Sequence, residues 1–168
     1  MVVVLEEILA ASTTKKALVR RYQRETLMGY VNSISYLQPT GIELLSEEGN
    51  VVSIPYDEIK TVAFVRDFEP GGEMERSTFL TRPKMAGLWV SFRFRDGEIL
   101  EGILPNNLLQ LDHHGFVVIP PDPNGNQQRV FVPRQAVMAV EVLGVVGSPL
   151  KKRKPAPVSQ DQIRLFEE

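Results

Sequence analysis

The chain has 168 residues, 43% of them hydrophobic, so it is long enough for one ordinary domain or two small ones. Its 19 Lys and Arg residues against 21 Asp and Glu give a net charge of -2, which excludes an overall field that would recruit nucleic acid or an anionic membrane. The absence of cysteine excludes a disulfide framework, a thiolate metal cluster and a cysteine nucleophile.

The first segment, residues 1–15, is not expected to be a signal peptide. Its apolar start is interrupted by Glu6 and Glu7 before it reaches the length of a signal peptide. No stretch of the chain approaches the roughly 20 apolar residues of a membrane span. Residues 3–11 are expected to form a short helix. We therefore expect a soluble, cytoplasmic protein.

An internal repeat organises the next part of the chain. Gly29 aligns with Gly102. After a connection that is longer in the second copy, the stretch 52–55 aligns with 130–133. Both copies then show a hairpin, a strand that begins at glycine, a strand that ends at proline, one short turn and a last strand. The repeat predicts two small β-domains. We place the first at 16–66, a linker containing Pro-Gly-Gly at 67–86, and the second at 87–147.

Each copy carries the chemistry of β-strands. The clearest strand alternates polar residues with apolar ones that should face the core, namely Leu88, Val90, Phe92 and Phe94. Asp96 and Gly97 after it predict a hairpin turn. Pro55 and Pro133 cannot donate ladder hydrogen bonds, so each should end its strand and lead into one tight helical turn.

This five-strand order resembles the Sm-like and Src-homology-type small barrels over most of residues 16–145. The resemblance implies a mainly β protein of two tandem five-stranded small β-barrels, each closed by its last strand. A copy of roughly 50 residues has a marginal core, so we expect the copies to pack on each other. The second copy also resembles an uncharacterised bacterial family of unknown function, through Arg82-Pro83, Gly87-Leu88-Trp89-Val90, Glu101-Gly102 and Pro105-Asn106-Asn107.

No catalytic constellation is found in the sequence. His113 and His114 are adjacent at a strand end, where neighbouring side chains point apart, and Asp112 would be a third metal ligand only in a contorted loop. We expect solvated histidines on a turn and no metal site. Acidic pairs such as Asp57 and Glu58 have no surroundings that would strongly perturb a carboxyl group. The sequence therefore predicts a non-enzymatic binding protein without a cofactor.

Arg20, Arg21 and Arg24 offer one ligand hypothesis. Their Arg-x-x-x-Arg spacing resembles the guanidinium pair of PilZ domains, which implies binding of cyclic di-GMP. The downstream turn of that family is missing, because Asn32 is followed by Ile34 where serine belongs. The alternative interpretation is an exposed basic strand edge.

A second hypothesis is a nucleic-acid face in the second copy. Arg93 and Arg95 share the polar side of one strand with Trp89, and we expect Arg129 and Arg134 near by. Neither copy has the Arg-Gly or Lys-His pair that Sm-like RNA binders place before the last strand, so we expect at most weak, salt-sensitive binding. Alternatively, Trp89 covers a barrel end or the seam between the copies.

The segment 148–168 has the composition of a flexible basic tail, with Lys and Arg at 151–154 followed by two prolines. Near its end, Gln162, Ile163, Leu165 and Phe166 resemble the Gln-x-x-Leu-Phe peptide with which bacterial polymerases and repair factors bind the DNA sliding clamp. The resemblance implies that Gln162 bonds at the rim of the clamp pocket while Leu165 and Phe166 fill it. Alternatively, the tail folds back on the barrels or forms a last helical turn.

Overall fold

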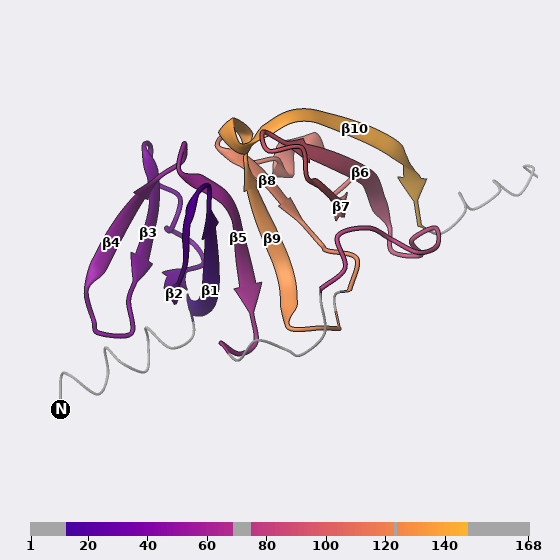
Figure 1. Ribbon diagram of the computed structural model, residues 1–168. Helices are drawn as coiled ribbons and strands as arrows, with labels where there is room; N and C mark the ends of the chain where they lie inside the picture. Colours follow the sequence, from indigo (N-terminus) through magenta and orange to yellow (C-terminus); the bar gives the residue numbers. More distant parts are fainter. Residues whose placement is uncertain (1–12, 69–74, 123, 148–168) are drawn as a thin grey trace, which may run out of the picture.

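The structure is a computed structural model that describes residues 13–68, 75–122 and 124–147. The prediction of a mainly β protein is confirmed (Figure 1). The expected helix at 3–11 and the tail at 148–168 lie outside the described residues. The elements are β1 (Thr14–Arg21), β2 (Arg24–Asn32), β3 (Gly41–Leu45), β4 (Val51–Pro55), β5 (Ile59–Val65), β6 (Gly87–Phe94), β7 (Ile99–Leu104), the 3-10 turn η1 (Leu108–Gln110), β8 (Gly115–Val118), β9 (Gln127–Pro133), the 3-10 turn η2 (Arg134–Ala136) and β10 (Val137–Val146).

The described strands form two sheets that share a hydrophobic core and whose backbones pair at one bridge. One sheet has the order β4-β3-β2-β1-β5-β9-β8 and the other β10-β6-β7. An isolated antiparallel bridge between Ile103 and Ile119 joins β7 to the end of β8. Followed through this bridge, the described strands run in one series from β4 to β10. These two strands lie at opposite ends of the molecule (Figure 1).

The two copies of the repeat have the same strand register. In each copy the first strand pairs with the second, and the glycine that begins the third strand faces the proline that ends the fourth. The corresponding pairs are Ala17 with Gly29 and Val90 with Gly102, then Gly41 with Pro55 and Gly115 with Pro133. The alignment made from the sequence is therefore the alignment of the folded copies.

Gly29 and Gly102 explain why the second and third strands of each copy meet at one point. A Cβ atom on Gly29 would lie 2.4 Å from the carbonyl oxygen of Leu45. A Cβ atom on Gly102 would lie 2.8 Å from the Cβ of Val118. Only glycine permits so close an approach of two strands.

The expectation that each last strand closes its own barrel is wrong for the described residues, whose strands close no barrel. A strand has two edges for hydrogen bonding. β5 uses one for β1 and the other for β9, which belongs to the second copy. No edge of β5 remains for β4. β10 pairs with β6 and not with β9.

Because β5 pairs with β9, each hydrophobic core contains side chains of both copies. Phe131 of β9 is fully buried in the first core, where its ring centroid lies 6.0 Å from that of Tyr36. Ala63 and Val65 of β5 are buried in the second core with Phe92. The two copies therefore form one folded unit with shared cores rather than two independent domains.

Polar groups close the seam between the copies on one side. The hydroxyl of Tyr22 donates to the carbonyl oxygen of Ala136 at 2.6 Å. The guanidinium of Arg95 lies over the Tyr22 ring, 4.3 Å from its centroid, and donates to the carbonyl oxygen of Asp57 at 2.7 Å. These contacts fix the angle at which the two copies meet.

The predicted strand and turn features are confirmed. Val90, Phe92 and Phe94 are buried and Leu88 is half-buried against the second core. Gly97 has a φ of +88°, as the hairpin turn requires.

The described ends of the segment 67–86 pack on both copies. Asp67 pairs with Lys16 at 3.0 Å, and its backbone exchanges hydrogen bonds with the side chain of Asn126. The carbonyl oxygen of Ser77 accepts the N–H of Glu101 at 2.7 Å. In the part of the chain that the structure describes, no helix is long and apolar enough to cross a membrane.

The interlocked cores predict one cooperative unfolding transition. Phe131→Ala should lower the free energy of unfolding by about 3–5 kcal/mol, because it removes a ring buried under the other copy. Urea unfolding followed by far-UV circular dichroism and by the fluorescence of Trp89, the one tryptophan, measures this. The control Met138→Ala, at a side chain 73% exposed, should change little. Two transitions that separate by probe would contradict the interlocked cores.

The ion pairs of Lys60 predict that the stability of the fold depends on pH. Its Nζ lies 2.5 Å from carboxylate oxygens of both Asp96 and Glu98, across the seam. Burial alone would lower the pKa of Lys60, but hydrogen bonds with these two carboxylates hold it above its ordinary value. Burial alone would raise the pKa of Asp96, and the bond from Lys60 with other hydrogen bonds holds it below its ordinary value.

Lys60→Met should therefore lower the free energy of unfolding by about 1 kcal/mol near neutral pH. A lowered carboxyl pKa gives stability that is lost as the pH falls below about 4, and a raised lysine pKa gives stability that is lost as the pH rises above about 10. Urea unfolding across this range should show the difference from wild type fading at both ends. Lys84→Met, at an exposed lysine, is the matched control and should show no such pH dependence, and a Lys60→Met difference independent of pH would refute the ion pairs as its cause.

Candidate functional site

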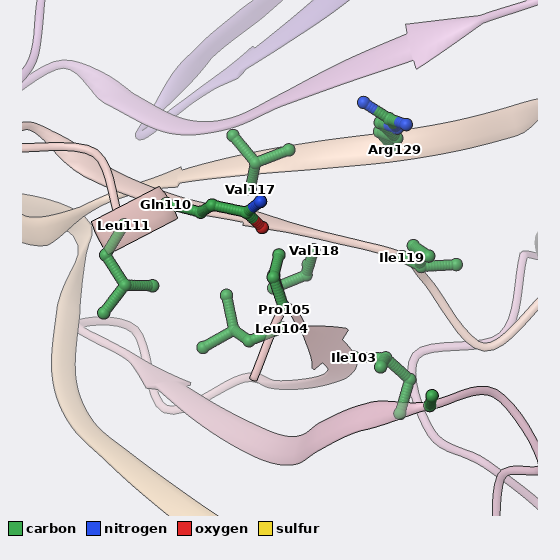
Figure 2. Close-up of a pocket in the computed structure, with 10 residues that line it drawn as sticks. Ile103, Leu104, Pro105, Gln110, Leu111, Val117, Val118, Ile119 and Arg129 are labelled. Atoms are coloured by element: carbon green, nitrogen blue, oxygen red, sulfur yellow. The ribbon is translucent and has the colours of Figure 1, made fainter. Parts of the chain in front are cut away.

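A hollow of about 440 Å³, here called the β8 pocket, opens between the end of β7 and β8 (Figure 2). Val117 and Arg129 lie on one side of it, and Ile103 and Leu104 lie across from them. Its wall is mainly apolar, and Gln110 and Arg129 are its long polar side chains. The lining residues are Ala86, Ile103, Leu104, Pro105, Gln110, Leu111, Val117, Val118, Ile119 and Arg129.

The pocket exists because β8 is the outer strand of its sheet. Within the described ranges, two backbone hydrogen bonds of 3.0 Å join the β8 segment to β7. In them Ile103 and Ile119 each donate an N–H to the carbonyl oxygen of the other. Backbone groups alternate in direction along an antiparallel strand, so Val117, two residues before Ile119, presents its N–H and C=O to the same outer edge. This edge borders the apolar hollow and is not paired with β7 there.

Arg129 connects the β8 pocket to a second hollow of about 200 Å³. Arg129 and Val117 line both, and the second is completed by Lys15, Ser33, Tyr36, Phe64 and Gln128. No hydrogen bond or ion pair of the Arg129 side chain occurs among the residues that the structure places. Two exposed cations, Lys15 and Arg129, therefore flank an apolar floor, which suits a ligand with apolar and anionic groups.

The first copy contains the counterpart of the β8 pocket, with a different character. A hollow of about 180 Å³ there is lined by residues at equivalent positions. Tyr30, Glu43, Leu45 and Val51 stand where the second copy has Ile103, Val117, Ile119 and Arg129. The pocket of the second copy is thus wider, it carries Arg129 where the first copy has Val51, and it has Val117 where the first copy has the carboxylate of Glu43. This difference favours an anionic ligand at the pocket of the second copy over that of the first.

Two tyrosines near the seam act as structural groups. Burial raises the pKa of Tyr56 to about 12, with Asp112 adding to the effect. The Tyr56 hydroxyl donates to the carbonyl oxygen of Gln38 at 2.6 Å. Burial also raises the pKa of Tyr36, again with a contribution from Asp112. Both phenols stay protonated at physiological pH, so neither is suited to act as a general base.

Trp89 and Arg93 are already engaged on the smaller sheet. The indole N–H of Trp89 donates to Glu101 at 3.1 Å, and its ring meets Phe79 edge to face with centroids 6.2 Å apart. Trp89 thus packs against the connection between the copies, rather than on the seam. Arg93 is 58% exposed and lies 3.9 Å from Glu141.

The structure does not bring the predicted nucleic-acid residues together. Arg95 is bound at the seam, as described above. Arg134 donates to the carbonyl oxygens of His113 at 3.0 Å and Asp112 at 3.5 Å, and lies over the ring of Phe116. Arg95 and Arg134 therefore hold the fold, and Arg129 alone of the five lines the β8 pocket.

The three arginines of the cyclic-dinucleotide hypothesis are paired with acids. Arg20 lies 3.3 Å from Glu75, and Arg24 lies 3.0 Å from Glu58. Arg21 lies 4.0 Å from Glu58 and donates to the carbonyl oxygen of Glu25. This pattern favours the alternative interpretation of a basic strand edge, because these carboxylates compete with a bound phosphate.

The histidine pair also has a structural place. His114 stacks on Tyr56 across the seam, with ring centroids 4.9 Å apart, while His113 is exposed. The side chain of Asp112 accepts the backbone N–H of His114 at 2.7 Å. Within the described ranges, no group of three His, Cys, Asp or Glu side chains is arranged to hold a metal ion.

Sequence reasoning named Arg129 but missed the pocket that it lines. The repeat alignment contained a signal for this pocket, because two aligned positions differ in charge between the copies. Val117 aligns with Glu43, and Arg129 aligns with Val51. The clamp-docking residues Gln162, Ile163, Leu165 and Phe166 lie outside the described residues.

Comparison with known proteins adds a family and no activity. A family of unknown function, DUF6982, matches residues 13–144, which is most of the chain. No curated protein and no solved structure matches the chain.

Proposed function

The chain belongs to DUF6982, a family of unknown function, and we propose from the geometry of its own residues that it is a non-enzymatic adaptor protein. The folded part binds an extended segment of a partner protein at the β8 pocket. The observation that supports this proposal is the meeting of three features at one place: an open strand edge, an apolar hollow and the exposed cation Arg129.

Each feature recognises a different part of an extended peptide. The outward N–H and C=O of Val117 offer hydrogen bonds to a peptide backbone laid along β8. Alternate side chains of such a peptide point to the same face, so an apolar one can enter the hollow between Leu104 and Val118. Arg129 then pairs with an Asp or Glu of the peptide. The free backbone groups favour a peptide over a small organic acid, which could not use them.

The C-terminal residues supply the second half of the adaptor. In this proposal Gln162, Leu165 and Phe166 bind the bacterial DNA sliding clamp in the cytoplasm, and the basic residues at 151–154 add attraction to the DNA inside it. The protein would thus hold the partner of the β8 pocket at the clamp. Support for this half comes from the Gln-x-x-Leu-Phe spacing alone.

The strand order supports a relation of each copy to the Sm-like and Src-homology-type small barrels. In this proposal each copy is a barrel of that kind that stays open, because its fourth and last strands do not pair with each other. A weak RNA-binding function is the less favoured alternative, because Trp89 is engaged by Glu101 and Phe79.

The β8 pocket predicts a selectable peptide. Random nonapeptides displayed on phage and selected on the whole protein should be enriched in sequences with alternate apolar residues and one Asp or Glu. A synthetic peptide of the enriched sequence should bind in fluorescence anisotropy, and Arg129→Ala should weaken it about tenfold through loss of a charge-assisted hydrogen bond.

The matched control is Arg93→Ala, which removes the same charge from an exposed strand position away from the pocket. It should leave the affinity unchanged. Selection without an acidic consensus, or equal losses with the two variants, would overturn the proposed site.

The tail predicts weak binding to the clamp of the same organism, with a Kd of about tens of micromolar at best. Burial of Leu165 and Phe166 should contribute roughly 1.5–3 kcal/mol each, reduced by the cost of ordering the segment. In surface plasmon resonance, both the full protein and a peptide of residues 160–168 should bind. The double change Leu165→Ala and Phe166→Ala should lose nearly all binding.

Arg164→Ala, at a position that the motif leaves free, is the control and should bind as wild type does. Because the anchor is apolar, the peptide's affinity should be insensitive to salt, whereas the contribution of residues 151–154 should fall with salt. Absence of binding at hundreds of micromolar, roughly tenfold above the Kd that the upper burial estimate allows, would exclude the clamp.

A further inference from the structure

β4 and β10 each have one edge without a partner strand, although the equivalent edges in the other copy are paired. β5, the last strand of the first copy, pairs with β9, the fourth strand of the second. The last strand of one copy therefore pairs with the fourth strand of the next copy, and we call this the pairing rule of the repeat. β10 is the last strand of the second copy and β4 is the fourth strand of the first. Each ends the series of described strands with one edge unpaired.

The burial of β10 differs from that of β5 as this rule requires. Val62 and Ala63 of β5, which pair with β9 in the same sheet, are 0% and 1% exposed. Their counterparts in β10 are Val140, 38% exposed, and Glu141. Val142, the counterpart of the half-buried Phe64, is 61% exposed. β10 thus carries the apolar side chains of a central strand in the position of an edge strand.

The outer edge of β4 shows the complementary pattern. Val130 and Phe131 of β9 are buried where β9 meets β5. The corresponding positions in β4 are Val52, 37% exposed, and Ser53, and the preceding Val51 is 67% exposed. β4 contains no charged residue, and β10 contains only Glu141. Neither edge has the lysine or inward-facing charge with which soluble proteins block pairing between sheets.

We propose that β10 of one chain pairs antiparallel with β4 of a second copy, which repeats between chains the β5–β9 pairing found within the chain. The internal register then transfers position by position. The pair Val62–Phe131 becomes Val140–Ser53, Ala63–Val130 becomes Glu141–Val52, and Phe64–Arg129 becomes Val142–Val51. The last of these brings together two valines that are both exposed in the isolated chain.

The geometry makes this contact head-to-tail. β4 and β10 lie at opposite ends of the molecule, so they cannot pair within one chain (Figure 1). The two surfaces are different, so each chain keeps one unpaired edge until a ring closes, or else the chains extend as a filament. The β8 pocket belongs to neither edge. This inference therefore stands or falls independently of the proposed function.

The test uses the full chain and three single substitutions. Wild type should form oligomers that grow with concentration between low and high micromolar in analytical ultracentrifugation. Val51→Lys blocks β4 and Val142→Lys blocks β10, and each variant alone should be monomeric. Both positions are exposed in the isolated chain, so circular dichroism should show that the variants keep the fold. Met138→Lys is the matched control on β10, because its counterpart is Lys60, which lies outside the β5–β9 register, and it should assemble as wild type does.

Mixing the two blocked variants distinguishes head-to-tail pairing from every symmetric alternative. The mixture should give a one-to-one heterodimer and nothing larger, because one intact β10 and one intact β4 remain. Native mass spectrometry identifies it from the masses of the two chains. A monomeric wild type at high micromolar concentration would overturn the proposal. A dimer of Val51→Lys alone, formed through two β10 strands, would also overturn it.

Discussion

The antiparallel pairing of β5 with β9 holds two copies of a marginal repeat together as one folded unit. A copy of this size has a marginal core, and the pairing adds buried side chains of the other copy to it. It brings Phe131 under the first copy and Ala63 and Val65 under the second. Because β9 pairs with β5 and not with β10, β4 and β10 each keep one unpaired edge at the ends of the described strand series.

Much of the local structure could be predicted because it depends on short-range rules. The alternation around Phe92 predicts a half-buried strand, and Pro133 ends its strand because it has no N–H to donate. The repeat is readable because Gly29 and Gly102 are required wherever the second strand approaches the third. These requirements act within a few residues and leave a direct mark in the sequence.

Strand partnership could not be predicted in the same way. Nothing local in residues 59–65 states whether the free edge of β5 meets β4 or β9, since both offer apolar, proline-ended strands. The likeness to closed small barrels suggested the nearer partner, and the structure uses the more distant one. The same limit applies to the site. Arg95, Arg129 and Arg134 look alike in the sequence, but only the tertiary contacts of the first and third separate them from Arg129.

The shared first core also has a consequence for the order of events at the ribosome. Residues 14–65 leave the exit tunnel as a nascent chain whose core lacks Phe131 and whose β5 edge has no partner. Phe131 and the partner strand of β5 are both in β9. The first copy therefore stays incomplete until more than sixty further residues have been synthesised. During that interval the growing polypeptide exposes an apolar strand edge of the kind that chaperones bind. The first copy can therefore complete its core only after β9 has been synthesised.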